Sequence, residues 1–220
     1  SLAVASHGRA VTLARQRGTS DLLIASLTAL GTSEHHAGRM EDAEQHYQEA
    51  LTLAQQQADQ AAEATLRNNL GLVRQATGEV DQAAQLFRQA MALNQAMGNL
   101  ESEASNHVNL GMLAEARHQY DVAEQEFERA LELDKAAEQR MEIAADLLRL
   151  GRVADRRGFP DRGLAYSERA YRSYLAQGDR TQAISALTQA VSCARKLGGD
   201  SEVARLETEL RRVTSAHADR

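Results

Sequence analysis

A leucine–glycine pair recurs every 40 residues along this chain of 220 residues. A series of alanines keeps the same period, and so does a shorter series of aromatic residues. Repeats at a fixed period of this length are typical of architectures in which one supersecondary unit stacks on the next. The three series are Leu30-Gly31, Leu70-Gly71, Leu110-Gly111 and Leu150-Gly151; Ala10, Ala50, Ala90, Ala130 and Ala170; and Tyr47, Phe87 and Phe127.

Glycines mark the ends of the predicted helices, because glycine readily adopts the left-handed conformation that closes a helix. Gly38, Gly78 and Gly158 close one helix of their units, and His118 fills the equivalent place in the third unit. Gly18, Gly98 and Gly178 close the other helix. Only one proline and 4% aromatic residues are present, and good helix formers dominate, so the chain is predicted to be all-α. The expected helices cover residues 2–17, 21–37, 41–57, 60–77, 80–97, 100–117, 120–137, 140–157, 161–177, 180–197 and 200–214.

The repeats predict a single array over residues 1–220, since no long linker interrupts them. The first segment reads as the second helix of a hairpin whose first helix is missing from the sequence. Its stacking face should therefore be exposed, which indicates either truncation or a contact surface. The expected divisions are a half repeat (1–18), full repeats (19–58, 59–98, 99–138 and 139–178), and a degenerate repeat with a C-terminal cap (179–215).

The unit resembles the tetratricopeptide repeat, which has Leu-Gly in its first helix and Ala-x3-Phe/Tyr followed by Ala in its second. The second unit, for example, has Leu70-Gly71, Ala83, Phe87 and Ala90. The fourth unit departs from the pattern, with Gly163 and Ser167 in place of the alanine and the aromatic residue. The 40-residue length is similar to that of the long units in spindle-orientation adaptors, kinesin light chains and the sensor arrays of bacterial regulators. The resemblance implies a right-handed superhelix, or α-solenoid, of about 11 helices.

The resemblance also implies that the first helices line a concave groove in which a peptide or a partner helix binds. Residues three and four apart share a helix face, and the face next to each Leu-Gly pair carries amides and guanidinium groups. Asn69, Asn109 and Arg149 are similar in type to the residues with which heat-shock cochaperones of this family hold a carboxylate. The predicted groove residues are Thr65, Asn68, Asn69, Gln75, Asn109, Met112, Arg149, Arg152 and Arg156.

The charge is uneven along the chain, although the net value is −6. Residues 1–138 hold 10 basic and 20 acidic side chains, and residues 139–220 hold 15 basic and 11 acidic side chains. We therefore expect a partly acidic peptide, with its negative groups near Arg149, Arg152 and Arg156. The net acidity argues against nucleic acid as a ligand, because phosphate binding needs a basic surface.

No catalytic pattern is found, and we expect no enzymatic activity, no cofactor and no metal. Glu34, His35, His36 and His46 lie close in sequence, but adjacent histidines on a helix point about 100° apart, which suits one ion poorly. The single cysteine, Cys193, is expected to be buried, and it is compatible with a cytoplasmic location. No apolar run is long enough to span a membrane. The leading prediction is a protein-interaction scaffold, and the alternatives are a self-associating array and the peptide-sensing arm of a larger regulator.

Overall fold

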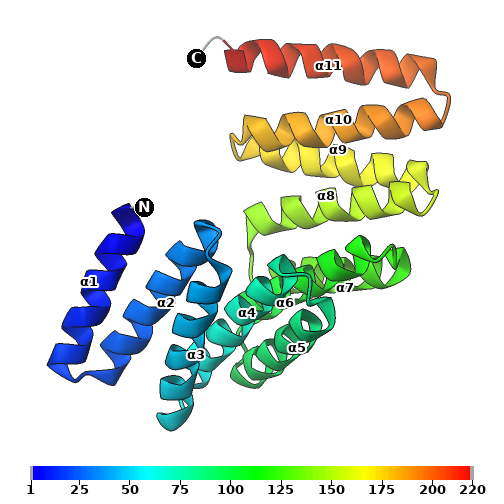
Figure 1. The fold of residues 1–220 in the computed structure, drawn as a ribbon. Helices are drawn as coiled ribbons and strands as arrows, with labels where there is room; N and C mark the ends of the chain where they lie inside the picture. The colour runs from blue at the N-terminus through cyan, green and yellow to red at the C-terminus, as the bar shows by residue number, and fades with distance from the viewer. Residues whose placement is uncertain (1, 219–220) are drawn as a thin grey trace. The chain divides into compact units, whose positions relative to one another are not determined.

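The computed structural model describes residues 2–218, and within them it contains eleven α-helices (Figure 1). The predicted all-α fold is confirmed, and helix bounds agree within one residue except at the end of the last helix, which continues to Ala218. The helices are α1 (Leu2–Arg17), α2 (Ser20–His36), α3 (Met40–Gln56), α4 (Gln60–Ala76), α5 (Val80–Met97), α6 (Leu100–Ala116), α7 (Tyr120–Ala136), α8 (Arg140–Arg156), α9 (Pro160–Ala176), α10 (Arg180–Lys196) and α11 (Asp200–Ala218).

The contacts group the chain into two units, Ser1–Asn106 and His107–Arg220, with the boundary inside α6. In unit 1, α1 packs on α2, α2 on α3, α3 on α4, and α4 on α5. In unit 2, α7, α8, α9, α10 and α11 pack in the same sequential way. The first helices of successive hairpins also touch, α2 with α4 and α8 with α10. Each unit has its own hydrophobic core.

The turns between helices follow a period of 20 residues, half that of the repeat. Every turn has one residue in the left-handed conformation, where glycine is favoured because it has no Cβ. Three turns use another residue there: Ala58 (φ 55°), His118 (φ 59°) and Glu138 (φ 56°). The glycines in this conformation are Gly18, Gly38, Gly78, Gly98, Gly158, Gly178 and Gly198. The predicted role of glycine as helix punctuation is therefore confirmed.

An aromatic ring lies on the glycine of the Leu-Gly pair in each regular hairpin. A methyl group added to Gly71 would come within 2.5 Å of Phe87 Cε1, and one added to Gly31 within 2.7 Å of Tyr47 Cε1. The same contact joins Gly111 and Phe127 in unit 2. The Phe87 ring is fully buried, so moving it away from a methyl group on Gly71 would disturb the core packing.

The fourth hairpin replaces this contact with small residues. A methyl group at Gly151 would meet Ser167 Oγ at 2.7 Å, and one at Gly163 would meet Cys193 Sγ at 3.0 Å. Cys193 is fully buried, as predicted. The hairpin of α8 and α9 is thus packed by close backbone approach rather than by a large ring.

Two polar pairs lie in the core, at positions where Ala54 and Leu66 stand in the preceding repeat. In unit 1, Asn94 Nδ2 donates to Asn106 Oδ1 at 2.8 Å. Forty residues later, in unit 2, Asp134 and Asp146 occupy the same two positions, with exposed fractions of 3% and 0%. Burial raises the pKa of Asp146 from 3.8 to about 7; Arg149 opposes the shift, and Asp134 adds to it. Desolvation disfavours the charged form of a buried carboxyl group.

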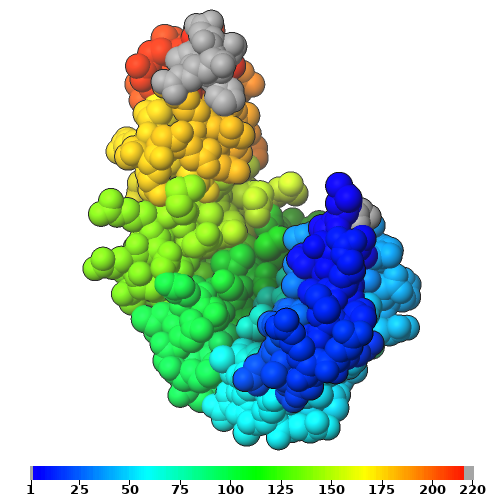
Figure 2. All heavy atoms as spheres, turned by 90° about the vertical axis from the view of Figure 1, so that its left-hand side faces the viewer, coloured from blue at the N-terminus to red at the C-terminus, as the bar shows by residue number. Residues whose placement is uncertain are grey.

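The predicted exposure of the first stacking face is seen on α1. Ala3 is exposed, whereas the equivalent Ala43, Ala83 and Ala123 are fully buried. Figure 2 shows α1 at the surface that faces the viewer. Between residues 2 and 218, none of the helices combines the length and the apolar character needed to cross a membrane.

The glycine–aromatic contact predicts that Gly71→Ala destabilises the fold by about 1–3 kcal/mol, the usual result of overpacking a core. Gly8→Ala is the matched control, because Gly8 also lies inside a helix but a methyl group there has no neighbour within 4 Å. Alanine should stabilise that position by up to about 1 kcal/mol. Urea unfolding of both variants measures the difference, and equal effects would contradict this role of Gly71.

The buried carboxyl pair predicts a pH-dependent stability. The pKa of Asp146 is higher in the folded than in the unfolded chain, so its stabilising contribution is lost as the pH rises through about 7. An asparagine side chain at this position stays neutral throughout. Asp146→Asn should therefore gain stability relative to wild type, by on the order of 1–3 kcal/mol between about pH 5 and pH 8.

Denaturant unfolding at several pH values measures this gain. Asp161→Asn is the control, because Asp161 is exposed on the same unit. If the stability curves of wild type and Asp146→Asn run parallel over this pH range, the interpretation of the pair is wrong.

Candidate functional site

The predicted groove residues are divided between the two units. Thr65, Asn68, Asn69 and Gln75 lie on α4 in unit 1, and Asn109, Met112, Arg149, Arg152 and Arg156 lie on α6 and α8 in unit 2. The candidate sites are therefore described within each unit.

A groove in unit 2 brings three of the predicted residues together. It has a volume of about 460 Å³ and is formed by the first helices α6, α8 and α10, with side chains from the end of α9 and the turn that follows. The α8 residues that line it are three or four positions apart, so they share one helix face. The lining residues are Met112, Met141, Glu142, Ala145, Leu148, Arg149, Arg152, Tyr174, Asp179 and Gln182.

Both arginines in this groove are already paired within unit 2. Arg149 Nη1 donates to Asp146 Oδ1 at 2.6 Å. Arg152 donates from Nε and Nη2 to the two oxygens of Glu115, at 2.7 and 2.8 Å. This two-point hydrogen bond raises the pKa of Arg152 above its ordinary value. The guanidinium groups are thus not the open cationic surface that the residue counts indicated.

The acidic residues of the groove balance its arginines. The carboxylate of Asp179 caps α10 by accepting a hydrogen bond from Gln182 N at 3.0 Å. Glu142 is exposed at the start of α8, and no ion pair holds it among the described residues. The lining therefore has two positive and two negative side chains, so its electrostatic attraction for an acidic ligand is weak.

Methionines supply the exposed apolar surface of the groove. Met112 and Met141 are 42% and 44% exposed. Methionine side chains are flexible and polarisable, which lets them adapt to apolar groups of different shape. Tyr174 is buried below them, and burial raises the pKa of its hydroxyl. The groove can accept an apolar side chain against the methionines, beside two arginines that are already paired within the protein.

Unit 1 contains a smaller pocket of about 160 Å³, lined mainly by amides and hydroxyls. Asn106 links two neighbours in it: it accepts from Asn94 and donates from Nδ2 to Asn68 Oδ1 at 3.0 Å. Thr65 and Asn68 line this pocket, whereas Asn69 and Gln75 do not. Asn94 and Asn106 were missed, although polar residues at positions where the preceding repeat has Ala54 and Leu66 are a detectable signal.

The remaining predicted residues lie apart from these two sites. Asn109 on α6 is half-buried and does not line the groove. Arg156 lines a different depression, near the turn after α8. In the histidine-rich stretch, His46 Nδ1 lies 2.6 Å from Glu34 Oε2, and Arg39 also contacts Glu34, at 3.1 Å. Over the described part of the chain, no three His, Cys, Asp or Glu residues gather in a way that could hold a metal ion.

Comparison with solved structures shows the same fold along nearly the whole chain. BtubC from P. vanneervenii is 21% identical, with a TM-score of 0.87, over 98% of this chain and 91% of that one. A STAND signal-transduction ATPase with a tetratricopeptide repeat sensor, from Pyrococcus horikoshii, is 13% identical with a TM-score of 0.82, over 90% of this chain and 31% of that one. A Rap protein complexed with Competence and Sporulation Factor is 15% identical with a TM-score of 0.70, over 90% and 55%.

Family comparison agrees with the repeat pattern. Residues 21–96 and residues 104–136 match two family models described as tetratricopeptide repeat. None of the curated proteins compared matches the sequence. The Leu-Gly and alanine positions, the helix hairpins and both family matches agree, and the chain belongs to the tetratricopeptide repeat family.

Proposed function

We propose that the chain is a protein-interaction module and that the groove of unit 2 binds a segment of a partner polypeptide. The observation that carries this proposal is the pair of exposed methionines, Met112 and Met141, in a groove formed by three first helices. Tetratricopeptide repeats generally act as interaction scaffolds, and a Rap protein of this fold forms a complex with a factor. A peptide-sensing arm of a larger protein is a form of the same function.

Apolar contact is the proposed main source of affinity. Arg149 and Arg152 already contact Asp146 and Glu115, so an acidic ligand would have to compete with these existing partners. The acidic peptide predicted from the sequence is therefore the second form of this proposal. In this form of the proposal, Arg152 gives up its ion pair with Glu115 and pairs with a carboxylate of the ligand.

We assign the chain no catalytic role. A cytoplasmic location remains a prediction. Burial raises the pKa of the Cys193 thiol to about 11, so this residue is neither accessible nor ionised as a nucleophile would need to be. Nucleic acid, membrane and cofactors are not part of the proposed function.

Selection of a displayed peptide library on the wild-type chain tests the groove. Enriched peptides should contain an apolar anchor residue, and their affinity should fall roughly 10- to 100-fold in Met112→Lys/Met141→Lys, because each methionine loses its apolar contact. Leu197→Lys is the control, since Leu197 is a 47% exposed apolar residue outside the groove. Peptides that bind the double variant and wild type equally well would refute the site.

The Arg152→Gln variant separates the two forms of the proposal. A loss of affinity confined to acidic peptides would favour the acidic ligand, and unchanged affinity would favour apolar recognition. Arg149 is left intact in this test, because its removal would leave the buried Asp146 without its partner.

Self-association is the second candidate function, and the open face of α1 favours it. Leu13 on the same helix is 55% exposed, and uncovered helix faces of this kind mark contact surfaces. Light scattering over a concentration series should show a rising mass that Ala3→Glu suppresses. A mass that stays at that of the monomer at every concentration would exclude this candidate.

A further inference from the structure

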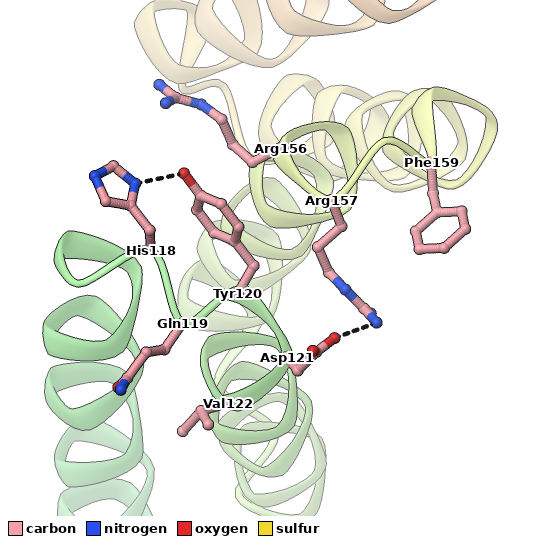
Figure 3. A pocket seen from close by; sticks show the side chains of 8 residues that line it. All are labelled: His118, Gln119, Tyr120, Asp121, Val122, Arg156, Arg157 and Phe159. Carbon is pink, nitrogen blue, oxygen red and sulfur yellow. Dashed lines mark hydrogen bonds and ion pairs between the residues drawn. The ribbon is translucent and has the colours of Figure 1, made fainter.

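Unit 2 has a second depression, at the hairpin turns and outside the proposed groove. Its volume is about 680 Å³. It is lined by residues 118–122, which form the turn before α7 and its first residues, and by Arg156, Arg157 and Phe159 at the turn after α8 (Figure 3). Arg156 was predicted to line the groove, but it lines this depression instead.

One turn of this depression differs from the turns at the equivalent position of the other repeats. The corresponding turns after α2, α4, α8 and α10 use glycine in the left-handed conformation, but here His118 adopts it, with φ 59°. A side chain disfavours that conformation, and such residues concentrate at functional sites. The His118 ring lies 2.8 Å, Nδ1 to hydroxyl, from Tyr120. Both residues line the depression, and Figure 3 shows their side chains directed at each other.

One arginine in the lining of the depression has no ion pair among the described residues. Arg157 is paired with Asp121 and Glu124, and its guanidinium carbon lies 5.3 Å from the centre of the Phe159 ring. Arg156 is exposed, and among the described residues no carboxylate contacts it. Figure 3 shows its guanidinium group on the same side as the pair formed by His118 and Tyr120. The acid of the lining, Asp121, is paired with Arg157, so Arg156 is the arginine of the lining that has no carboxylate partner in the described part of the chain.

Exposed apolar groups accompany this charge. Phe159 is 43% exposed and Val122 is 45% exposed, in a chain in which aromatic residues make up only 4%. Arginine, tyrosine and phenylalanine are the side chains enriched at protein interfaces, where they contribute much of the binding energy. The depression thus combines an open guanidinium group with apolar contact surface.

We propose that this depression is a second docking site, which binds an acidic segment of a partner polypeptide. An Asp or Glu side chain of the partner pairs with Arg156 beside His118 and Tyr120, and an adjacent apolar side chain covers Phe159 or Val122. Arginine suits this role because its planar donors match a carboxylate at two points. This site is distinct from the groove. In unit 2, the groove would bind apolar segments and the depression at the hairpin turns would bind acidic ones.

Fluorescence polarisation with a labelled peptide that alternates Glu with Leu and Phe tests the proposal. We expect saturable binding that weakens as salt is raised, and a loss of roughly tenfold in Arg156→Gln. Arg169→Gln is the matched control, because Arg169 is also an exposed arginine of unit 2, no ion pair holds it among the described residues, and the change in net charge is the same. The same peptide with Gln in place of Glu should bind wild type and Arg156→Gln equally, because it has no carboxylate to pair with Arg156.

Two further variants distinguish this site from the groove and binding from folding. Adding Arg156→Gln to Met112→Lys/Met141→Lys should again cost roughly tenfold relative to the methionine variant alone, so failure of the groove proposal would leave this one standing. His118→Gly should raise the thermal unfolding midpoint, because it removes the left-handed side chain, yet weaken peptide binding.

Three outcomes would overturn the proposal. They are equal binding by Arg156→Gln and wild type, an equal loss in Arg169→Gln, and binding of a phosphoserine peptide in the absence of binding by the Glu peptide. Thermal unfolding of each variant confirms that the folded chain is being compared.

Discussion

The contact between an aromatic ring and a glycine sets how closely the two helices of each regular hairpin approach. Phe87 lies on Gly71 and Phe127 on Gly111, at distances that leave no room for a methyl group. The ring fills the space that the absent side chain leaves, so both residues are needed at once. Because a single hairpin cannot bury its remaining apolar faces, the neighbouring hairpins must then stack. The fourth hairpin shows the other solution, with Ser167 facing Gly151 and a closer backbone approach.

Polar residues in the core link this packing to the candidate sites. Asn94 and Asn106 form a hydrogen-bonded pair in unit 1, and Asp134 with Asp146 takes the same positions one repeat later. The first pair extends through Asn68 to the small amide pocket, and the second holds Arg149 at the edge of the groove. Buried polar groups are costly unless they are paired, so these pairs fix the position of the side chains that lie above them. The position of Arg149 in the groove therefore depends on Asp146, which lies in the core and not in the lining.

Helix α8 contributes to both proposed docking sites. One of its faces supplies Met141 and Arg152 to the groove, and its last turn supplies Arg156 to the depression at the hairpin turns. The difference between these arginines is their environment. Arg152 is held by Glu115, whereas Arg156 has an open guanidinium group. If the two proposals hold, a partner with an apolar segment and a nearby acidic segment would bind more tightly than either segment alone.

The sequence by itself determined the period, the helices and their ends, because these depend on local physics. A glycine that can adopt the left-handed conformation and a good N-cap act within one turn of helix, and Met112, Arg149 and Arg152 were placed together by the spacing of residues on helix faces. Only the tertiary structure decided which charges are free. Glu115 and Arg152 are 37 residues apart, and Arg156 is separated from His118 by a similar stretch of chain. Whether such side chains meet depends on how the hairpins stack. The residue pattern of one helix does not determine which ion pairs it forms with the neighbouring helices.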